Sequence, residues 1–290
     1  MSIMGENHQP DYPEVTLPNT QLRHFASSIV DQEYSLFISL PLSMGTSVRK
    51  YPVLYMLDAN AGFCALAEIA RLLSMGNEIH EMIIVGISYP GGFKQWQTLR
   101  TRDYTPSVWP AFMETQGNSF LTQADYRKIM GGAESFLDFI RDELKPFVEQ
   151  NYPVESNDSG ILGDSFGGLF ALFSLLTRPD TFSRYIIGSP SIWWDNAILH
   201  TIEQEYASVN TDLAANVFMS VGSAEDDIGE QAVDKLLQPR MLEGMRWMAK
   251  TLKERNYKSL ELTEVVLEGE SHLSAVAPFI NKGLKTIYGI

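Results

Sequence analysis

The chain has 290 residues, and 44% of them are apolar, which is enough for a substantial core and excludes global disorder. Its formal net charge of -14 argues against nucleic acid and anionic membrane surfaces as partners, because both reward clusters of Lys and Arg. Cys64 is the only cysteine, so no intrachain disulfide can form. The sequence begins without a basic and apolar leader, and no apolar run is long enough to span a bilayer. These features predict a soluble cytoplasmic protein.

The first third of the chain predicts an antiparallel hairpin followed by strands and helices in alternation. Residues 21–30 and 33–40 form the expected hairpin, since the second stretch alternates between two faces. Residues 51–57 are continuously apolar, as in a strand buried on both faces. A helical period follows over residues 61–75, and a second buried strand is expected over residues 81–89.

Residues 90–130 interrupt this alternation, because they show no clear period. Loops of this length inside a compact domain are usually functional or disordered. The segment is rich in aromatic side chains, which argues against disorder. We therefore expect an aromatic-rich, lid-like insertion that packs over one end of the sheet.

Alternation resumes after the insertion and continues to the end of the chain. The further elements expected are helix 132–152, strand 161–162 with a helix from 167, strand 185–188, helix 193–206, strand 216–221, helix 230–256, strand 260–267 and helix 275–287. This order predicts an α/β fold with one mostly parallel sheet, helices on both faces and an antiparallel hairpin at its start. No linker divides it, so residues 1–290 are expected to form a single domain.

A G-x-S-x-G motif lies between a short predicted strand and a predicted helix. The stretch 159–169 reads S-G-I-L-G-D-S-F-G-G-L. A strand that reverses into a helix within a few residues strains the backbone of Ser165 and exposes its hydroxyl. Gly163 and Gly167 lack side chains, so the strand and the helix can approach closely. Ser165 is therefore the candidate nucleophile.

A serine nucleophile needs a base that takes its proton, and the chain offers five histidines. Of these, only His272 directly follows the C-terminal end of a predicted strand, in a short glycine-containing loop. Ligands bind at this end of the strands in open α/β sheets. His272 is therefore the candidate base.

The acid that orients the base is expected between the serine and the histidine in folds of this kind. The predicted strand 216–221 leads into Glu225, Asp226 and Asp227, three adjacent carboxylates. We favour Glu225, because a turn at Gly222 brings the residue three positions later back toward the sheet. Asp226 and Asp227 are alternatives, and at least one of the three is expected to be a solvated surface charge. A dyad of Ser165 and His272 with only a weak third member is a further alternative.

Three further features are candidates for contact with the substrate. An oxyanion hole needs two backbone N–H groups, which Phe166 and Asn60 are best placed to supply. Arg100 and Arg102, in the insertion, are either surface salt-bridge partners or contacts for an anionic substrate. Trp193 is either a core residue or the wall of a pocket.

Motifs of other chemistries are absent from the sequence. It contains no phosphate-binding glycine loop, no dinucleotide-binding fingerprint, no H-E-x-x-H and no cysteine pair. We therefore expect no metal and no organic cofactor. The expected partner is a small-molecule ester, without nucleic acid or membrane.

Six stretches, in order along the chain, together resemble one known family. They are L-Y-M-L-D-A-N-A-x-F (54–63), T-R-D-Y-T-P (101–106), G-G-A-E-S-F-L-D-F-I-R-D-E-L-K-P-F-V (131–148), G-D-S-F-G-G-L-F-A-L (163–172), S-P-S-I-W-W (189–194) and G-E-S-H (269–272). The sequence resembles the esterase D group of α/β-hydrolases and is most similar to its siderophore (enterobactin-type) trilactone esterases. The resemblance implies an α/β-hydrolase fold and serine esterase chemistry.

Carried over position by position, the resemblance implies Ser165 as nucleophile, His272 as base and Glu225 as the acidic partner. It also implies that Asn60 donates an oxyanion amide. The chain departs from the family pattern at Ala59, where glycine is usual. It departs again at Asp164, where histidine is common.

The chain is therefore expected to hydrolyse a carboxylic ester through an acyl-enzyme, on a siderophore-type trilactone or another small ester. An acyltransferase that uses the same three residues is one alternative, because an alcohol can replace water as acyl acceptor. A binding protein that has kept the fold without catalysis is the other.

Overall fold

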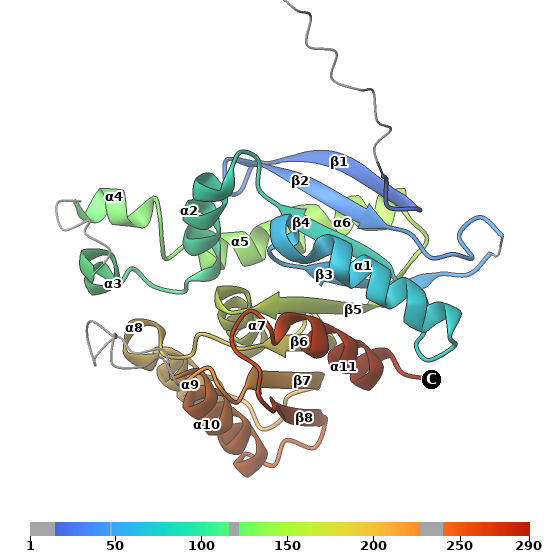
Figure 1. The fold of residues 1–290 in the computed structure, drawn as a ribbon. Coiled ribbons are helices and arrows are strands. Elements are labelled where there is room, and N and C mark those ends of the chain that lie inside the picture. Colours follow the sequence, from blue (N-terminus) through green and yellow to red (C-terminus); the bar gives the residue numbers. More distant parts are fainter. Residues whose placement is uncertain (1–14, 47, 116–121, 227–239) are drawn as a thin grey trace, which may run out of the picture.

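An eight-stranded sheet forms the centre of the computed structural model, which describes residues 15–46, 48–115, 122–226 and 240–290 (Figure 1). The strand order across the sheet is β1-β2-β4-β3-β5-β6-β7-β8. The strands are β1 (Thr20–Ser27), β2 (Gln32–Ser39), β3 (Tyr51–Met56), β4 (Ile83–Ser88), β5 (Val154–Asp164), β6 (Arg184–Gly188), β7 (Ala215–Gly222) and β8 (Leu260–Leu267).

The sheet is mostly parallel, and the predicted fold class is confirmed. The strands from β4 across to β8 run parallel to one another, whereas β1 pairs antiparallel with β2, and β2 with β4. The predicted hairpin turns at Asp31, whose φ of 54° is a left-handed conformation that aspartate tolerates well. The central strands are buried on both faces because helices cover both.

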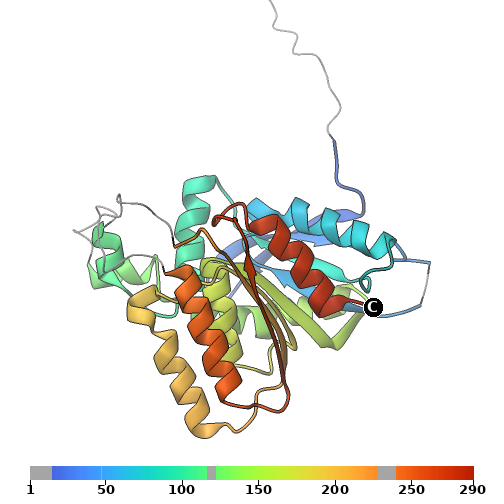
Figure 2. The same ribbon diagram turned by 60° about the horizontal axis from the view of Figure 1, so that its bottom comes forward.

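Helices pack on both faces of the sheet, and each face has its own core (Figure 2). Because successive strand residues point to opposite faces, Ile161 joins one core and its neighbour Leu162 joins the other. The first core lies under α5 (Ala133–Phe139), α7 (Phe166–Thr177), α9 (Leu199–Val209) and α10 (Met241–Glu254). The second lies under α1 (Ala59–Met75) and α11 (Val276–Tyr288), which contact each other.

The segment 90–130 contains helices that the sequence did not predict. They are α2 (Phe93–Tyr104), α3 (Pro110–Thr115) and α4 (Gln123–Arg127). Helix α2 packs against α5 and α7, and Tyr104 at its end is fully buried. Most other residues of α2 are polar, so the apolar residues are too few to show a helical period in the sequence.

The predicted helix over residues 132–152 is present but contains a wider turn. A π-helical turn, η1 (Ile140–Leu144), joins α5 to α6 (Lys145–Asn151). The N–H of Lys145 donates to the carbonyl of Ile140, five residues earlier. Pro146 follows directly and has no N–H to continue the regular ladder, which explains the wider turn at this position.

One other predicted helix differs from expectation, and a second is described only in part. The one predicted over residues 193–206 is divided into α8 (Trp194–Ala197) and α9, because Asp195, Asn196 and Ala197 have positive φ angles. In the one predicted over residues 230–256, the described part is α10, and residues 230–239 lie outside the described ranges. Across the ranges that the structure describes, no helix has the length and apolarity needed to cross a bilayer.

Candidate active site

Ser165 occupies the sharp turn between β5 and α7. Its backbone has φ 61° and ψ −119°, a conformation that a residue with a side chain adopts only under strain. Its N–H donates to the carbonyl of Gly188 at 3.0 Å, and its own carbonyl accepts from Leu169 at 3.0 Å. An added Cβ on Gly163 would lie 2.3 Å from the carbonyl oxygen of Gly167. Strand and helix therefore approach as closely as predicted at Gly163.

The second close approach lies one residue later than predicted. An added Cβ on Gly167 would lie 3.4 Å from Cβ of Leu57, close to an ordinary van der Waals contact. At Gly168 it would lie 2.7 Å from the carbonyl oxygen of Gly188. The tight packing of α7 against β6 thus depends on Gly168 and not on Gly167.

The loops after β7 and β8 bring Glu225 and His272 together. Nδ1 of His272 lies 2.8 Å from Oε2 of Glu225. The other carboxylate oxygen, Oε1, accepts from the Ser189 hydroxyl at 2.5 Å and from the Gly222 N–H at 2.7 Å. The Glu225 side chain is only 1% exposed, against 37% for His272. A buried, fully partnered carboxylate thus holds one nitrogen of a partly open imidazole.

The hydrogen bonds at this pair shift both pKa values toward the charged forms. The bond to Glu225 is the main cause that raises the pKa of His272, against the opposing effect of burial. Burial by itself would raise the pKa of Glu225, but the hydrogen bonds from His272, Ser189 and Gly222 outweigh it and lower that pKa. Glu225 is therefore ionised at neutral pH and favours a proton on His272.

The neighbouring carboxylate of Asp226 does not take the place of Glu225. Asp226 accepts from the backbone N–H groups of Leu242 and Glu243 at 3.1 and 3.3 Å, and so caps the first turn of α10. Asp227 lies outside the described residues. Of Glu225 and Asp226, the structure places Glu225 against His272.

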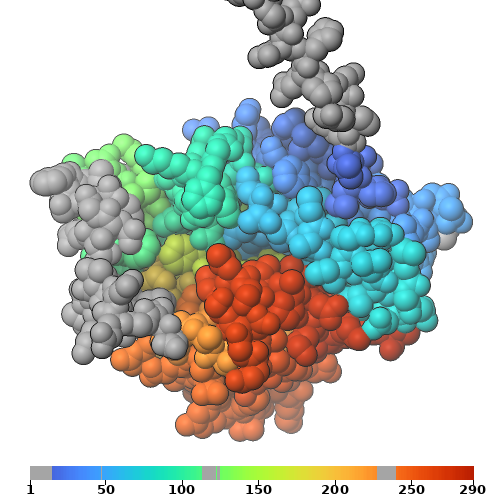
Figure 3. All heavy atoms as spheres, viewed as in Figure 1, coloured from blue at the N-terminus to red at the C-terminus, as the bar shows by residue number. Residues whose placement is uncertain are grey.

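Ser165 and His272 line one cavity of about 490 Å³. One part of its wall is polar and aromatic, with Asp58, Trp96 and Arg100. Another part is apolar and comes from β3, β5, α1 and α11, with Met56, Leu162, Val276, Phe279 and Ile280. Figure 3 shows this face of the molecule, with α2 in teal above the red segment that leads into α11. The cavity is large enough for a small ester.

Asp58 connects α2 to the start of α1 at this cavity. Arg100 donates two hydrogen bonds of 2.7 Å to the Asp58 carboxylate, and Nε1 of Trp96 donates a third at 2.9 Å. The guanidinium also lies 5.3 Å from the ring centre of Phe166, the residue after Ser165. Arg100 therefore reaches both the loop before α1 and the turn at the nucleophile.

The two predicted oxyanion amides belong to the first turns of two helices. Phe166 is the first residue of α7, and Asn60 is the second residue of α1. First-turn N–H groups have no carbonyl partner within their own helix and are free for a ligand. The side chain of Asn60 exchanges two hydrogen bonds with the backbone of Tyr89, at 2.8 and 2.9 Å, which anchors this turn to the end of β4.

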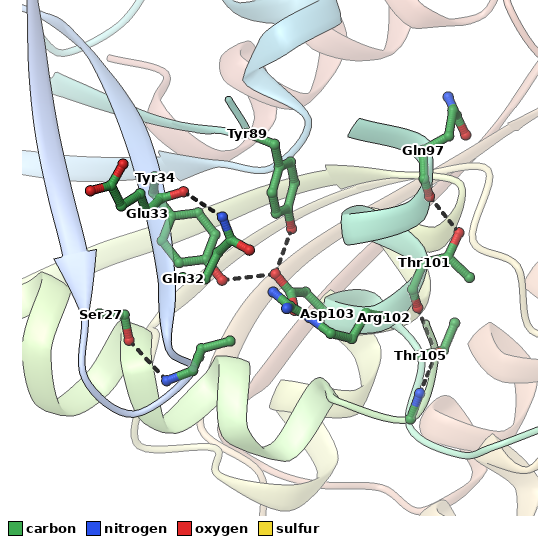
Figure 4. Close-up of polar contacts among 12 residues, drawn as sticks. Ser27, Gln32, Glu33, Tyr34, Tyr89, Gln97, Thr101, Arg102, Asp103 and Thr105 are labelled. Atoms are coloured by element: carbon green, nitrogen blue, oxygen red, sulfur yellow. Dashed lines mark hydrogen bonds and ion pairs between the residues drawn. The ribbon is translucent and has the colours of Figure 1, made fainter. Parts of the chain in front are cut away.

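Arg102 lies away from the cavity that holds Ser165, contrary to what a substrate contact requires. Its Nε donates to Asp103 at 2.6 Å, and Asp103 also accepts from the hydroxyls of Tyr34 and Tyr89 at 2.8 and 3.0 Å (Figure 4). Arg102 lines a separate cavity with residues such as Val30 and Ser107. Two helix positions apart, Arg100 and Arg102 point to nearly opposite sides of α2, and Arg100 is the one that faces Ser165.

Trp193 belongs to an aromatic cluster beside the turn at the nucleophile. It is partly buried, and its ring centre lies 6.1 Å from those of Trp109, Phe112 and Phe166. Its Nε1 lies 3.2 Å from the sulfur of Met241. Trp193 and Phe112 thus bring residues from α3 and the loop before α8 next to the residue that follows Ser165.

Ser189 and Trp96 of this site were not predicted from the sequence, whereas Arg100 was a candidate together with Arg102. Ser189, which holds Glu225, directly follows the C-terminal end of β6, a position that could have marked it. Arg100 and Trp96 are four residues apart, a spacing that places them on one face once the segment is known to be helical. Within the described ranges, no group of His, Cys, Asp or Glu side chains is arranged to hold a metal ion.

Comparison with known proteins gives one family. A family model described as "Putative esterase" matches residues 27–259. The ferri-bacillibactin esterase BesA of Bacillus subtilis is 30% identical over 93% of this chain and 90% of its own length. The siderophore triacetylfusarinine C esterase of Aspergillus fumigatus is 30% identical over 98% of this chain and 97% of its own length.

Solved structures agree with the sequence comparison. The BES protein from Bacillus cereus superimposes with a TM-score of 0.79 at 29% identity and covers 98% of this chain and 100% of its own. The siderophore hydrolase EstA from Aspergillus nidulans gives a TM-score of 0.76 at 26% identity, with 95% and 97% covered. The similarity therefore includes the whole sheet and the loops at its carboxyl edge.

Proposed function

Since the chain belongs to the esterase family and is a carboxylic-ester hydrolase, we propose that it cleaves its substrate through an acyl-enzyme on Ser165. The observation that carries this proposal is the bond of 2.8 Å between His272 and Glu225, at the edge where Ser165 occupies a strained turn. A strained serine, an imidazole and a buried carboxylate in this chain order are the groups that acyl transfer needs.

In the first half of the reaction, His272 takes the proton of the Ser165 hydroxyl while the serine oxygen attacks the ester carbonyl. Glu225 fixes the imidazole with Nδ1 protonated, so that Nε2 is free to act as the base. The amides of Phe166 and Asn60 receive the negative charge that develops on the carbonyl oxygen. His272 then gives its proton to the leaving alcohol.

In the second half, His272 takes a proton from a water molecule that attacks the acyl carbon. The bond to the Ser165 oxygen then breaks, His272 returns the proton to that oxygen, and the carboxylic acid leaves. The raised pKa of His272 supports both halves, because the imidazolium formed at each step is stabilised by Glu225. The partial exposure of His272 leaves a path for the alcohol to depart and for water to enter.

The substrate that we propose is a siderophore-type ester, and a cyclic trilactone is the first to be tested. BesA and the triacetylfusarinine C esterase align with this chain almost from end to end, and the activities in their names support this proposal. Within the insertion 90–130, α2 contributes Trp96 and Arg100 to the cavity, so this segment takes part in selecting the ester.

We also propose that the protein is cytoplasmic, since its only cysteine, Cys64, is free and exposed.

The direct test combines covalent labelling with mutation. A fluorophosphonate probe is expected to label Ser165 in the wild type, as mass spectrometry of the peptides would show. Ser165→Ala is expected to lose both the labelling and the hydrolysis of the cyclic trilactone and of p-nitrophenyl acetate. Ser208→Ala, an exposed serine at the end of α9, is the matched control and keeps both. Unchanged hydrolysis by Ser165→Ala would contradict the proposal.

A further inference from the structure

Beside the nucleophile lies the carboxyl group of Asp164, which is partly buried and which the proposed reaction does not use. Asp164 is the last residue of β5, directly before Ser165, and it lines the same cavity as Ser165 and His272. Its Oδ1 atom is buried and has no hydrogen-bond partner among the residues that the structure describes. Because this oxygen is packed inside, the carboxyl acts on a group in the cavity through its charge and not through a hydrogen bond to Oδ1.

The packing around Asp164 holds its Oδ1 atom in place. Oδ1 lies against Gly188, where an added Cβ would be only 2.5 Å away, and the ring of Phe279 lies against the same glycine. The nearby cavity wall is apolar, with Leu162, Phe279 and Ile280. Charge on Asp164 is therefore weakly screened and acts strongly on any group bound near Ser165.

Four charged or titratable groups face Asp164 from the elements around it. They are Asp58 before α1, Arg100 of α2, Glu225 after β7 and His272 after β8. Arg100 and Asp58 neutralise each other through their two hydrogen bonds. Glu225 stays ionised, as its lowered pKa requires. With His272 neutral, the uncompensated charge at this end of the sheet is therefore negative, and it becomes more negative when Asp164 ionises.

We propose that Asp164 determines the charge selectivity of the site: its carboxylate favours esters that carry a cationic group close to the scissile bond. This inference rests on the proposed function, because it concerns the same reaction at Ser165. It narrows the substrate class to siderophore-type or other small esters that are cationic near the ester group. Anionic groups at that position are disfavoured by the same field.

The selectivity is expected to depend on pH. Burial raises the pKa of Asp164 to about 7; Glu225 and Asp58 act in the same direction, and His272 and Arg100 act against it. Below this pH the carboxyl is mostly neutral and discriminates little. Above it the carboxylate attracts a cation, so the preference for a cationic ester grows as the pH rises through 7.

The experiment compares two esters of the same shape and different charge. Choline acetate carries a permanent positive charge, and its analogue has a quaternary carbon in place of the quaternary nitrogen. A second pair of p-nitrophenyl esters carries the same two groups on the acyl chain, which covers both orientations in the cavity. The ratio of kcat/KM values within a pair is measured from pH 6 to pH 8.5. Protonation of His272 affects both members equally and cancels in the ratio.

In the wild type, the cationic member of at least one pair is expected to be preferred about tenfold at pH 8.5, and less at pH 6. Asp164→Asn keeps the shape, removes the charge and is expected to bring the ratio close to one at every pH. Glu254→Gln is the matched control, because it removes one carboxylate from the exposed end of α10. It is expected to keep the wild-type ratio.

An Asp164→Asn ratio equal to the wild-type ratio would overturn the inference, as would a wild-type ratio that does not change with pH. The pH series uses the wild type alone, so it decides the question even if Asp164→Asn fails to fold. Failure of the proposed function would look different: hydrolysis of the uncharged esters would then be absent or would persist in Ser165→Ala.

Discussion

Arg100 holds the carboxylate of Asp58 with two hydrogen bonds of 2.7 Å and so ties α2 to the loop that begins α1. Only 10% of the Arg100 side chain and 15% of the Asp58 side chain are exposed. Asp58 itself has a φ of 53°, and the two hydrogen bonds from Arg100 help to maintain this left-handed conformation. The position of the Asn60 amide relative to Ser165 therefore depends on a contact with the insertion.

Breaking this pair is expected to reduce stability and activity together. Arg100→Met leaves the Asp58 carboxylate buried without its cation, which costs about 3–5 kcal/mol in the free energy of unfolding. Arg100→Lys keeps the charge but cannot bridge both oxygens, so its loss is smaller. Urea unfolding is expected to show that the free energy of unfolding decreases from the wild type to Arg100→Lys and again to Arg100→Met. A Met variant as stable as the wild type would show that the pair does not hold the loop.

The Glu225 carboxylate is expected to matter more for kcat than for folding. Glu225→Gln removes the charge and favours the wrong imidazole tautomer, so kcat is expected to fall by about a thousandfold or more. Ser189→Ala removes one of three hydrogen bonds to the carboxylate and is expected to lower kcat by about tenfold. Asp226→Asn is the control, because Asp226 caps α10. If Asp226→Asn lost as much kcat as Glu225→Gln, the assignment of the acid would be wrong.

The acid limb of the pH–activity profile follows from the same pair. Since the hydrogen bond to Glu225 is the main cause that raises the pKa of His272, kcat/KM of the wild type is expected to fall on the acid side at a pH above the usual histidine value. In Ser189→Ala the carboxylate holds the imidazole less firmly, and the limb is expected to move to lower pH. If the acid limb of Ser189→Ala lay at the same pH as that of the wild type, Ser189 would not act on His272 through Glu225.

Stability is expected to fall with rising pH because of Asp164. Its pKa is about 7 in the folded protein, against an ordinary value of 3.8, so between these values the folded state binds more protons than the unfolded state. The stabilisation is complete below the unfolded pKa and is lost as the pH rises through the folded one. Asp164→Asn does not titrate, so its stability relative to the wild type is expected to increase from pH 5 to pH 8, by about 2–3 kcal/mol. Urea unfolding at the two pH values measures this difference, and an equal difference at both would contradict it.

The turn at Ser165 offers a matched pair of glycine substitutions. Gly163→Ala would push a methyl group to 2.3 Å from a backbone carbonyl that cannot move without shifting α7, so it is expected to abolish folding or activity. Gly167→Ala meets Leu57 at 3.4 Å and is expected to keep most of the activity. Soluble yield, circular dichroism and ester hydrolysis distinguish the two. Equal tolerance of both substitutions would contradict the close approach of β5 and α7.

The sequence was most informative where the order of apolar, polar and glycine residues along a short stretch directly reflects the place of that stretch in the fold. Continuous apolar runs identified the buried strands, because a strand covered on both faces has no polar side to alternate with. The turn chemistry around Ser165 and the position of His272 after β8 both follow from chain order alone. For the same reason, Glu225 could be favoured over its neighbours from the turn that follows β7, although three carboxylates stand there in a row.

The tertiary structure alone decided what faces the cavity. Whether Arg100 or Arg102 points toward Ser165 depends on the orientation of α2, and polar residues hide the period of that helix. Ser189 reaches Glu225 only because β6 and β7 are neighbours in the sheet, a pairing between residues 36 positions apart in the chain. Packing around β5 and α11 likewise leaves Oδ1 of Asp164 without a hydrogen-bond partner among the residues that the structure describes. Chain order determines which residues arrive at the edge of the sheet, and only side-chain packing in three dimensions determines which of them meet.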